Sequence, residues 1–567
     1  MADGLDAVAG LAALATGYWG VDFVARRGGL ARAARALGVV VPTRAAVVAG
    51  AALTIGLAPL WRWEHVPQAD AVRAVALLLA AVLAWKASTR DIDVVSGGPG
   101  ALARLALVAC AAAVTISPAF IAPCAVLLGT LFGMWQHHAT LPMRLLQAVA
   151  AFVVLAPIAP FGLLSDAGTL LHFLVTIQAA HYVITALAKA LLGPRPWSWV
   201  VDNRLDHLAA SAWSWGWARF VPWPRWRRVI EIVRRVRVPL QAGAFGLELL
   251  APLALLDARL ALGFCLAWSA FHLGVFALSG LLFWDWIGAN LAVALGLFLL
   301  PETSAAEAFG WLPLGLGAGF LVALPLRHKL FAPMPLGWWD SPFTQRMHWI
   351  AHGESGTDYG VYADLMCPHE RLYGKVHGCF LAPHPVCTYH LGECFRVELR
   401  DALRAAGPCP EALDGVRARF GITPRDEAMA HAHRRYLAAF FDALNRGAPK
   451  RVLPRALRWL KAPGGQIFYW GDLPAYRGQE PIASVSLRYR EEYFDGARLH
   501  RLRDELVEAV EVEPLAPGEQ VREATPKEVD RLLLSHAIGR LIELPAFAGG
   551  YVGGDDGRNR ADEIDCA

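Results

Sequence analysis

Long apolar runs separated by short arginine-bearing connections fill the chain up to about Leu326. A helix needs roughly 20 consecutive apolar residues to cross the hydrocarbon core of a bilayer, and several of these runs reach that length. Beyond Arg327, polar and charged residues are mixed with apolar ones, as is typical of a domain outside the membrane. The sequence therefore predicts a polytopic α-helical membrane bundle of about ten helices, followed by an α+β extramembrane domain.

The apolar runs also give the expected positions of the spans. The candidates are residues 5–24, 44–62, 70–87, 102–119, 120–136, 145–164, 167–192, 239–256, 258–281, 283–301 and 308–326. The first is the weakest, because Asp6 and Asp22 bracket it. The opening "MADGLDAVAG" lacks the basic segment of a secretory signal, so we expect the membrane helices themselves to direct insertion.

Within the bundle domain, residues 1–326, one segment has a different composition. Residues 205–238 interleave tryptophans with arginines, as in "WSWGWARFVPWPRWRRVIEIVRRVRVP". Tryptophan favours the headgroup layer and arginine favours anionic lipid, so we interpret the segment as an interfacial amphipathic helix. A basic nucleic-acid patch is the alternative, but a net charge of +4 gives it little support, and we expect no nucleic-acid partner.

Arginine counts suggest an orientation and a location. The arginines from Arg26 to Arg44 fall on the same side as the 205–238 segment, which places the C-terminal domain in the cytoplasm if the span list is right. The Ala-, Arg- and Gly-rich composition is typical of a high-GC bacterium. We therefore expect a multi-pass protein of the bacterial inner (cytoplasmic) membrane.

The C-terminal domain, residues 327–545, mixes two periodicities. "VSLRYREEYF" alternates in the manner of a strand, and "QIFYWGDL" is also strand-like. "DEAMAHAHRRYLAAFFDALNRG" is helical, and Leu499, Leu502, Leu506 and Val510 recur at helical spacing. The Gly- and Asp-rich tail, residues 546–567, is expected to be disordered.

Polar side chains inside apolar runs are candidate functional residues, because burying them in lipid is costly. One expected helix carries Gln178, His181, Tyr182, Thr185 and Lys189 at spacings of three and four, so they share one face. This stripe could bind a ligand or take part in catalysis. Alternatively, Lys189 could extend from the helix end to the membrane surface.

A second candidate pair lies on the next two expected helices. Glu248 and His272 could form a histidine–carboxylate proton relay, or a structural hydrogen bond that holds the bundle together. Asp285 stands between two apolar runs and could simply mark a turn at the interface.

The C-terminal domain contains a dense cysteine and histidine cluster in "CPHERLYGKVHGCFLAPHPVCTYHLGEC". The candidate ligands for zinc or iron are Cys367, His369, Cys379, His384, Cys387, His390 and Cys394. Disulfides among these cysteines and Cys409 are an alternative if the domain is outside the cytoplasm, and free packing cysteines are a third.

The segments "TIQAAHYVITALAKALLGPRPWSW" and "GLELLAPLALLDARLALGFCLAWSAFHLGVF" resemble the HTTM (horizontally transferred transmembrane) domain family. This membrane domain is shared with vitamin K-dependent gamma-glutamyl carboxylase, and the resemblance covers about residues 160–330. It implies that Lys189 matches a lysine that helps to convert reduced vitamin K and oxygen into a strong base. That base removes a glutamate γ-proton before CO2 adds. The resemblance also implies that the C-terminal domain lies outside the cytoplasm.

Together these features predict an enzyme, either a carboxylase-like lyase or an oxidoreductase that uses a reduced quinone. Lys189, His181, Glu248 and His272 would be catalytic, and Gln178 and Tyr182 would contact the quinone. The expected partners are the lipid bilayer and a protein or peptide substrate. The alternative is a non-catalytic transporter or scaffold that anchors the C-terminal domain, and a third possibility gives the chemistry to the cysteine and histidine cluster.

Overall fold

The structure is a computed structural model of the whole chain. It describes residues 2–25, 59–92, 94–95, 100–131, 140–156, 166–310, 315, 337–362, 365, 384–385, 390–394, 396–420, 422–423, 427–465, 468–469, 473–514 and 516. Most of the expected spans 308–326 and 44–62, and all of the tail 546–567, lie outside these residues.

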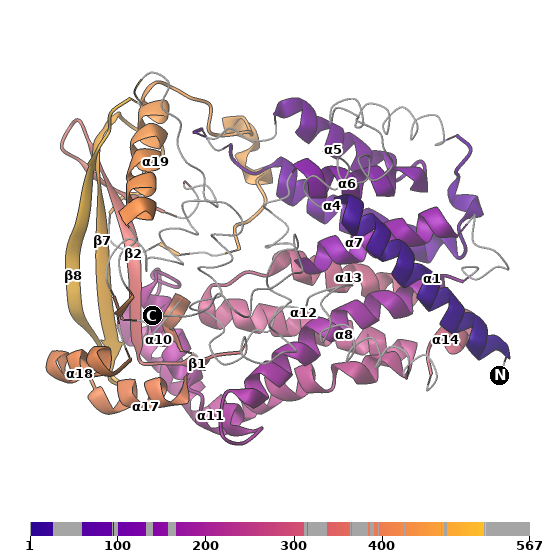
Figure 1. The fold of residues 1–567 in the computed structure, drawn as a ribbon, viewed down its shortest axis with the longest axis horizontal. Helices are drawn as coiled ribbons and strands as arrows, with labels where there is room; N and C mark the ends of the chain where they lie inside the picture. The colour runs from indigo at the N-terminus through magenta and orange to yellow at the C-terminus, as the bar shows by residue number, and fades with distance from the viewer. Residues whose placement is uncertain are drawn as a thin grey trace.

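Apolar helices form one end of the molecule and an antiparallel sheet forms the other (Figure 1). The helices of the first part are α1 (Ala2–Ala25), α4 (Ala69–Ser88), α5 (Ala101–Ala113), α6 (Ile121–Leu131), α7 (Thr140–Leu155), α8 (Ala167–Leu191), α9 (Ser198–Asp202), α10 (Leu205–Ser214), α11 (Trp223–Leu249), α12 (Ala258–Ser279), α13 (Trp284–Leu299) and α14 (Glu302–Ala308). Most of these helices share one hydrophobic core, whereas α9, α10 and the first part of α11 bury their apolar side chains in smaller clusters.

Helix α8 runs through the centre of this core. Its residues are buried on every side of the helix from Ala167 to Tyr182, which agrees with a sequence that is apolar all round. The side chain of Asp166 caps its N-terminus by accepting a hydrogen bond from the Gly168 amide at 3.0 Å. The polar residues of α8 therefore face other helices and not solvent.

Three helices in the described part of the chain, α4, α8 and α12, are long and apolar enough to cross a membrane. A fourth candidate is the pair α13 and α14, whose axes are bent by 115° at a short break. Helices α5, α6 and α7 are apolar but shorter than a span. A helical membrane bundle is compatible with this arrangement, whereas the expected number of about ten spans is not supported within the residues described.

The tryptophan- and arginine-rich segment folds differently from the single helix expected at residues 205–238. It contains α10 and the first part of α11, and α11 continues without a break through Pro239 to Leu249. The expected boundary between residues 205–238 and the span 239–256 is therefore absent, and Pro239 lies inside the helix. Whether this segment lies at a membrane surface stays a prediction.

The C-terminal part, expected to lie outside the membrane, contains a four-stranded antiparallel sheet in the order β3-β2-β7-β8. Its strands are β3 (Asp358–Val361), β2 (Phe343–Gly353), β7 (Ile482–Phe494) and β8 (Leu499–Glu511), accompanied by the short strands β1 (Trp339–Asp340), β4 (His384–Pro385), β5 (Glu393–Cys394) and β6 (Ile422–Thr423). Helix α19 (Glu427–Asn445) packs its aromatic side chains on one face of the sheet, while α17 (Val397–Ala406) and α18 (Pro410–Phe420) lie near one end of it (Figure 1). The predicted α+β character is thus present.

Strand β8 corrects one expectation. Leu499, Leu502, Leu506 and Val510 predicted a helix, but Leu499–Glu511 is a strand paired with β7 along its length. Opposite charges across the pair, such as Arg490 facing Asp504, favour the sheet. The apolar residues lose strand alternation because β8 shifts register with β7 at two irregularities.

The sheet-containing C-terminal part sits on one end of the helical bundle. The Trp85 indole at the end of α4 donates to the carbonyl of Leu460, and the Trp284 indole at the start of α13 donates to that of Pro463. Between α12 and α13, the backbone amide of Leu282 donates to the carbonyl of Gly465 at 2.9 Å. Because α8 runs toward the same end, its last turn faces the extramembrane domain.

Candidate functional site

A buried ion pair joins α8 and α11. The Nζ of Lys189 lies 2.7 Å from both Oε1 and Oε2 of Glu248, and the two residues are only 8% and 2% exposed. A charge buried at this depth is stable only with a partner, so each residue depends on the other. Lys189 therefore does not extend to the surface, which was one of the two interpretations of its place near a helix end.

The aromatic ring of Trp199 covers the same ammonium group. The Nζ of Lys189 lies 4.5 Å from the ring centroid, a distance at which a cation is attracted to the face of an indole. Trp199 is fixed in turn because its indole Nε1 donates to the carbonyl of Trp338 at 2.8 Å. This contact connects the ion pair to the first residues of the extramembrane domain.

A hydrogen-bonded network of neutral side chains lies about two helical turns away on α8. The hydroxyl of Tyr182 lies 2.9 Å from Nε2 of His272 and accepts from Nδ2 of Asn290 at 3.0 Å. The amide of Gln178 donates to Oδ1 of Asn290 at 2.8 Å. The seven-residue separation of Tyr182 and Lys189 places the network roughly 10 Å along α8 from the ion pair.

Aromatic rings enclose this network. Trp268 stacks on Tyr182 with ring centroids 4.3 Å apart, and Trp286 contacts the rings of Tyr182, His181 and His272 edge-on. Such walls exclude water and leave apolar surface beside a few oriented polar groups, which is the usual composition of a small-molecule site.

In this enclosure, two histidines keep ring nitrogens without a hydrogen-bond partner within the described residues. These are both nitrogens of His181 and Nδ1 of His272. His172 and His348, which lie elsewhere, also keep such ring nitrogens in the described part of the chain. Buried polar groups are almost always paired, so unpaired ring nitrogens in a shared aromatic enclosure are candidates for contact with a bound molecule.

The six residues predicted from sequence therefore separate into two clusters and one histidine. Lys189 and Glu248 form the ion pair, Gln178, Tyr182 and His272 belong to the network, and His181 packs against Trp286. The predicted pairing of Glu248 with His272 differs from the observed contacts, because each has another partner. Asn290 and Trp199 complete the two clusters, and sequence reasoning assigned no role to either of them.

Asp285 is not simply a marker of a turn. It lies in the first turn of α13, is 3% exposed, and forms an ion pair with Lys86 at 2.6 Å. This second lysine–carboxylate pair joins α13 to α4. It resembles the pair of Lys189 and Glu248 in chemistry, but it contacts no member of the network among the interactions described.

Most residues of the predicted metal cluster lie outside the part of the chain whose side chains are described. Cys367, His369, Cys379 and Cys387 lie outside the described residues, and only the backbone is described for His384 in β4 and His390 beside β5. Cys394 is a free, buried thiol whose Sγ lies 3.3 Å from the carbonyl oxygen of Arg396. No group of three metal-binding side chains occurs within the part of the chain that is described, and zinc or iron binding stays a prediction.

A buried carboxyl in the junction with the extramembrane domain was not predicted. Asp340 in β1 accepts from Nδ2 of Asn203 at 2.7 Å and from the Trp338 indole at 3.3 Å. Burial raises the pKa of Asp340 to about 7, although the hydrogen bond from Asn203 opposes this change. Glu393 lies opposite Asp340 in the β1–β5 pair and adds to the increase.

The comparisons with known proteins do not identify a relative. Neither a protein-family model, nor a curated protein, nor a solved structure matches the chain. The resemblance to the HTTM family therefore rests on the quoted residues alone, and any function must be argued from the site.

Proposed function

We propose that the protein is a multi-pass inner-membrane enzyme that acts on a lipophilic quinol, as the resemblance to the HTTM family implies. The observation that carries the proposal is the buried ion pair of Lys189 and Glu248 beside an aromatic-walled polar network. An ion pair that only stabilises the fold does not require an aromatic-walled polar network beside it. An enzyme for a lipophilic substrate requires both an apolar surface that binds the substrate and a group that accepts its proton.

The ion pair can supply a base without a change in the charge of the site. Transfer of one proton from Nζ of Lys189 to Glu248, 2.7 Å away, leaves a neutral amine and a neutral carboxylic acid. Neither member of the pair then carries a charge that burial would penalise. The amine can then accept a phenolic proton, and Glu248 holds the proton that it received.

The network supplies groups suited to a quinol. Tyr182 and Asn290 present a fixed hydroxyl and amide, and Trp268 and Trp286 provide flat apolar surfaces against which an aromatic ring can pack. The unpaired Nδ1 of His272 adds a further hydrogen-bonding group. A reduced quinone would bring two phenolic protons and two electrons, with oxygen as the electron acceptor.

The test is oxygen uptake by the full-length protein in proteoliposomes supplied with a reduced naphthoquinone. The wild type should consume oxygen in a saturable manner, and Lys189→Ala should abolish this turnover because it removes the base. Lys86→Ala is the matched control, since it breaks the other buried lysine–carboxylate pair without touching the network. It should retain turnover.

Each other outcome argues against the proposal. A folded wild type without turnover would exclude quinol oxidation and favour the transporter or scaffold alternative. Turnover that survives Lys189→Ala would move the chemistry elsewhere in the molecule. Equal losses in Lys189→Ala and Lys86→Ala would mean that both pairs serve only the stability of the bundle.

A further inference from the structure

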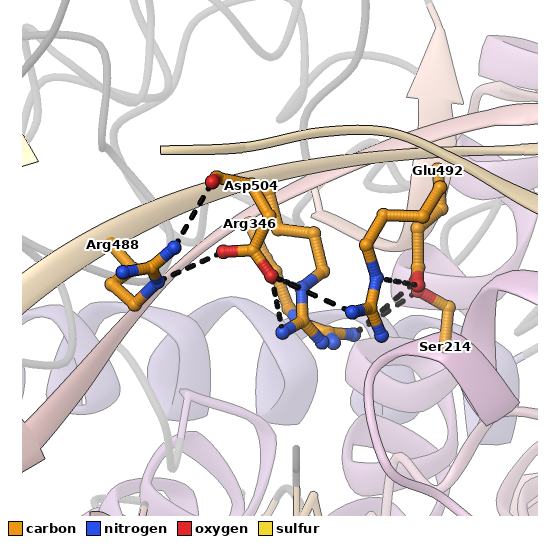
Figure 2. Close-up of polar contacts among 7 residues, drawn as sticks. Ser214, Arg346, Arg488, Glu492 and Asp504 are labelled. Atoms are coloured by element: carbon orange, nitrogen blue, oxygen red, sulfur yellow. Dashed lines mark hydrogen bonds and ion pairs between the residues drawn. The ribbon is translucent and has the colours of Figure 1, made fainter. Parts of the chain in front are cut away.

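Arginines gather on the face of the sheet that is opposite to α19. Arg346 in β2 lies across from Arg490 in β7. Arg488 comes two residues before Arg490 in the same strand, and Arg501 lies in β8. We call these four residues the arginine face. Figure 2 shows Arg346 lying between Asp504 and the pair of Glu492 and Ser214, with Ser214 contributed by α10.

The two carboxylates on this face are already engaged. Asp504 accepts from Nε of Arg488 at 2.9 Å and from Nη2 of Arg490 at 2.7 Å. Glu492 accepts a hydrogen bond from the Ser214 hydroxyl, and it lies 3.8 Å from both Arg346 and Arg501. Four guanidinium groups thus share two carboxylates, which leaves an excess of positive charge.

Arg346 keeps one edge of its guanidinium group unused. Its Nη1 donates to the Ser214 hydroxyl at 3.1 Å, but Nε and Nη2 have no hydrogen-bond partner within the described chain. The residue is only 3% exposed, so bulk water does not compensate for the missing bonds. The Nε and Nη2 hydrogens point in parallel, and this two-pronged edge matches two oxygens of a carboxylate or a phosphate.

A second group on the same face is also unsatisfied. His348 lies two residues after Arg346 in β2, and its Nδ1 has no partner among the residues described. Burial first, and then the nearby arginines, lower the pKa of His348 well below its usual value, so its ring is neutral at pH 7. A neutral imidazole can still donate one hydrogen bond to an anion.

The electrostatic environment of Arg346 agrees with an uncompensated positive field. Burial is the main reason that the pKa of Arg346 falls to about 9, and Glu492 opposes the change. Arg490, Arg219 and Arg501 lower it further through repulsion. An anion beside these groups would relieve the repulsion and fill the unused edge of Arg346.

We propose that the arginine face binds a phosphate group through the Nε and Nη2 edge of Arg346, with Arg490 and Arg501 stabilising its charge. Arg501 is 57% exposed and Arg346 only 3%, so a ligand would approach past Arg501 and displace the side chains that cover the Nε and Nη2 edge of Arg346. The phosphate could belong to an anionic lipid headgroup or to a soluble phosphate compound. This site is separate from the pair of Lys189 and Glu248, and the inference does not depend on the proposed function.

The position of the face is compatible with either source. Ser214 ends α10, and three residues later the Trp217 indole donates to the carbonyl of Ala277 in the last turns of α12. Because α12 is one of the candidate spans, the face lies near the end of the bundle where lipid headgroups would be found. Soluble compounds reach the same end from the aqueous side.

The test measures thermal unfolding of the full-length protein in neutral detergent. The added probes are phosphatidylglycerol, inorganic phosphate, diacylglycerol as the lipid without phosphate, and chloride at the ionic strength of the phosphate sample. A ligand that binds only the folded protein raises its unfolding midpoint. We expect phosphatidylglycerol, inorganic phosphate or both to raise the midpoint relative to their controls, and the probe that acts identifies the source.

Variants assign the effect to the arginine face. Arg346→Met should weaken binding by about tenfold or more, because two charge-assisted hydrogen bonds are lost. Arg501→Gln should weaken it less, and it serves as the deciding variant if Arg346→Met does not fold. Arg446→Gln removes an exposed arginine from the end of α19 and should leave the response unchanged.

Three results would overturn the inference. The first is a wild-type midpoint that neither phosphate probe raises above its control. The second is a folded Arg346→Met or Arg501→Gln protein with the full wild-type response. The third is an equal loss in Arg446→Gln, which would mean that phosphate acts on overall charge and not at the arginine face.

Discussion

Asp340 is a residue whose surroundings make its charge state sensitive to ordinary changes in pH. It is 2% exposed, and its side chain accepts from Asn203 and Trp338. The Asn203 side chain also accepts from the Asp340 backbone amide at 2.8 Å, so the two residues fix each other across the junction. The cost of burying the charge nevertheless dominates and raises the pKa of the carboxyl to about 7.

This increase predicts a pH dependence of stability. The folded state binds the proton more tightly than the unfolded state, whose carboxyl has a pKa of about 3.9. The stabilising contribution is therefore complete below pH 4 and is lost as the pH rises through 7. Relative to Asp340→Asn, the wild type should lose about 1.4 kcal/mol for each pH unit between these values.

The measurement is the difference in unfolding midpoint between the wild type and Asp340→Asn across pH 4 to 8. The Asn side chain cannot ionise, so other titrating groups cancel in the difference. A difference that stays constant with pH would show that the pKa of Asp340 is not raised in the folded protein.

Helix α12 has a capping residue at each end, and its C-terminal end lies at the junction between the two parts of the molecule. Asp257 caps its start by accepting from the amides of Arg259 and Leu260. Gly280 ends it in the left-handed conformation, with φ of 75°, which glycine adopts without strain. A Cβ atom at this position would lie 2.9 Å from the ring of Trp217, so the turn also packs closely.

Gly280→Ala should therefore destabilise the protein by about 1–2 kcal/mol from backbone strain alone, with a further cost for the contact with Trp217. Gly274→Ala is the matched control within the same helix. A Cβ there meets nothing within 4 Å, and alanine is the better helix former, so stability should be unchanged or slightly higher. The check is chemical or thermal unfolding of both variants, and equal stabilities would contradict the assigned role of Gly280.

The same elements show which features could be predicted from the sequence. Helices α4, α8 and α12 follow from uninterrupted apolar runs, because length and hydropathy are properties of a single segment. The strand structure of β8 could not be predicted, because it depends on pairing with β7. That pairing is stabilised by opposite charges on the two strands, although the strands are close in the chain. Local periodicity contains no information about such a partner.

At the scale of the whole molecule, the extramembrane domain rests on the end of the bundle where α8 and α12 finish. Trp199 contacts both the ammonium of Lys189 and the carbonyl of Trp338, so the ion pair lies next to the junction between the two parts of the molecule. The ion pair therefore lies between the helical bundle and the sheet-containing domain.

The sequence predicted which residues belong to the candidate site, but not which of them contact each other. Polar residues in apolar runs identify Lys189, Glu248, Tyr182 and His272, because such residues are costly in a membrane. Their pairing was not predictable, since it depends on how far α11 runs past Pro239 and on which face of α12 meets α8. The arginine face was also missed, because its four arginines come from three strands whose register the sequence does not specify.

The most direct test of the central claim compares two variants that each remove a complete buried ion pair. Lys189→Met/Glu248→Gln and Lys86→Met/Asp285→Asn both avoid leaving an unpaired charge, which would cost about 3–5 kcal/mol. Both should therefore remain folded in proteoliposomes. We predict that naphthoquinol-dependent oxygen uptake disappears in the first variant and persists in the second. Oxygen uptake by a folded Lys189→Met/Glu248→Gln protein at the wild-type rate would contradict the account.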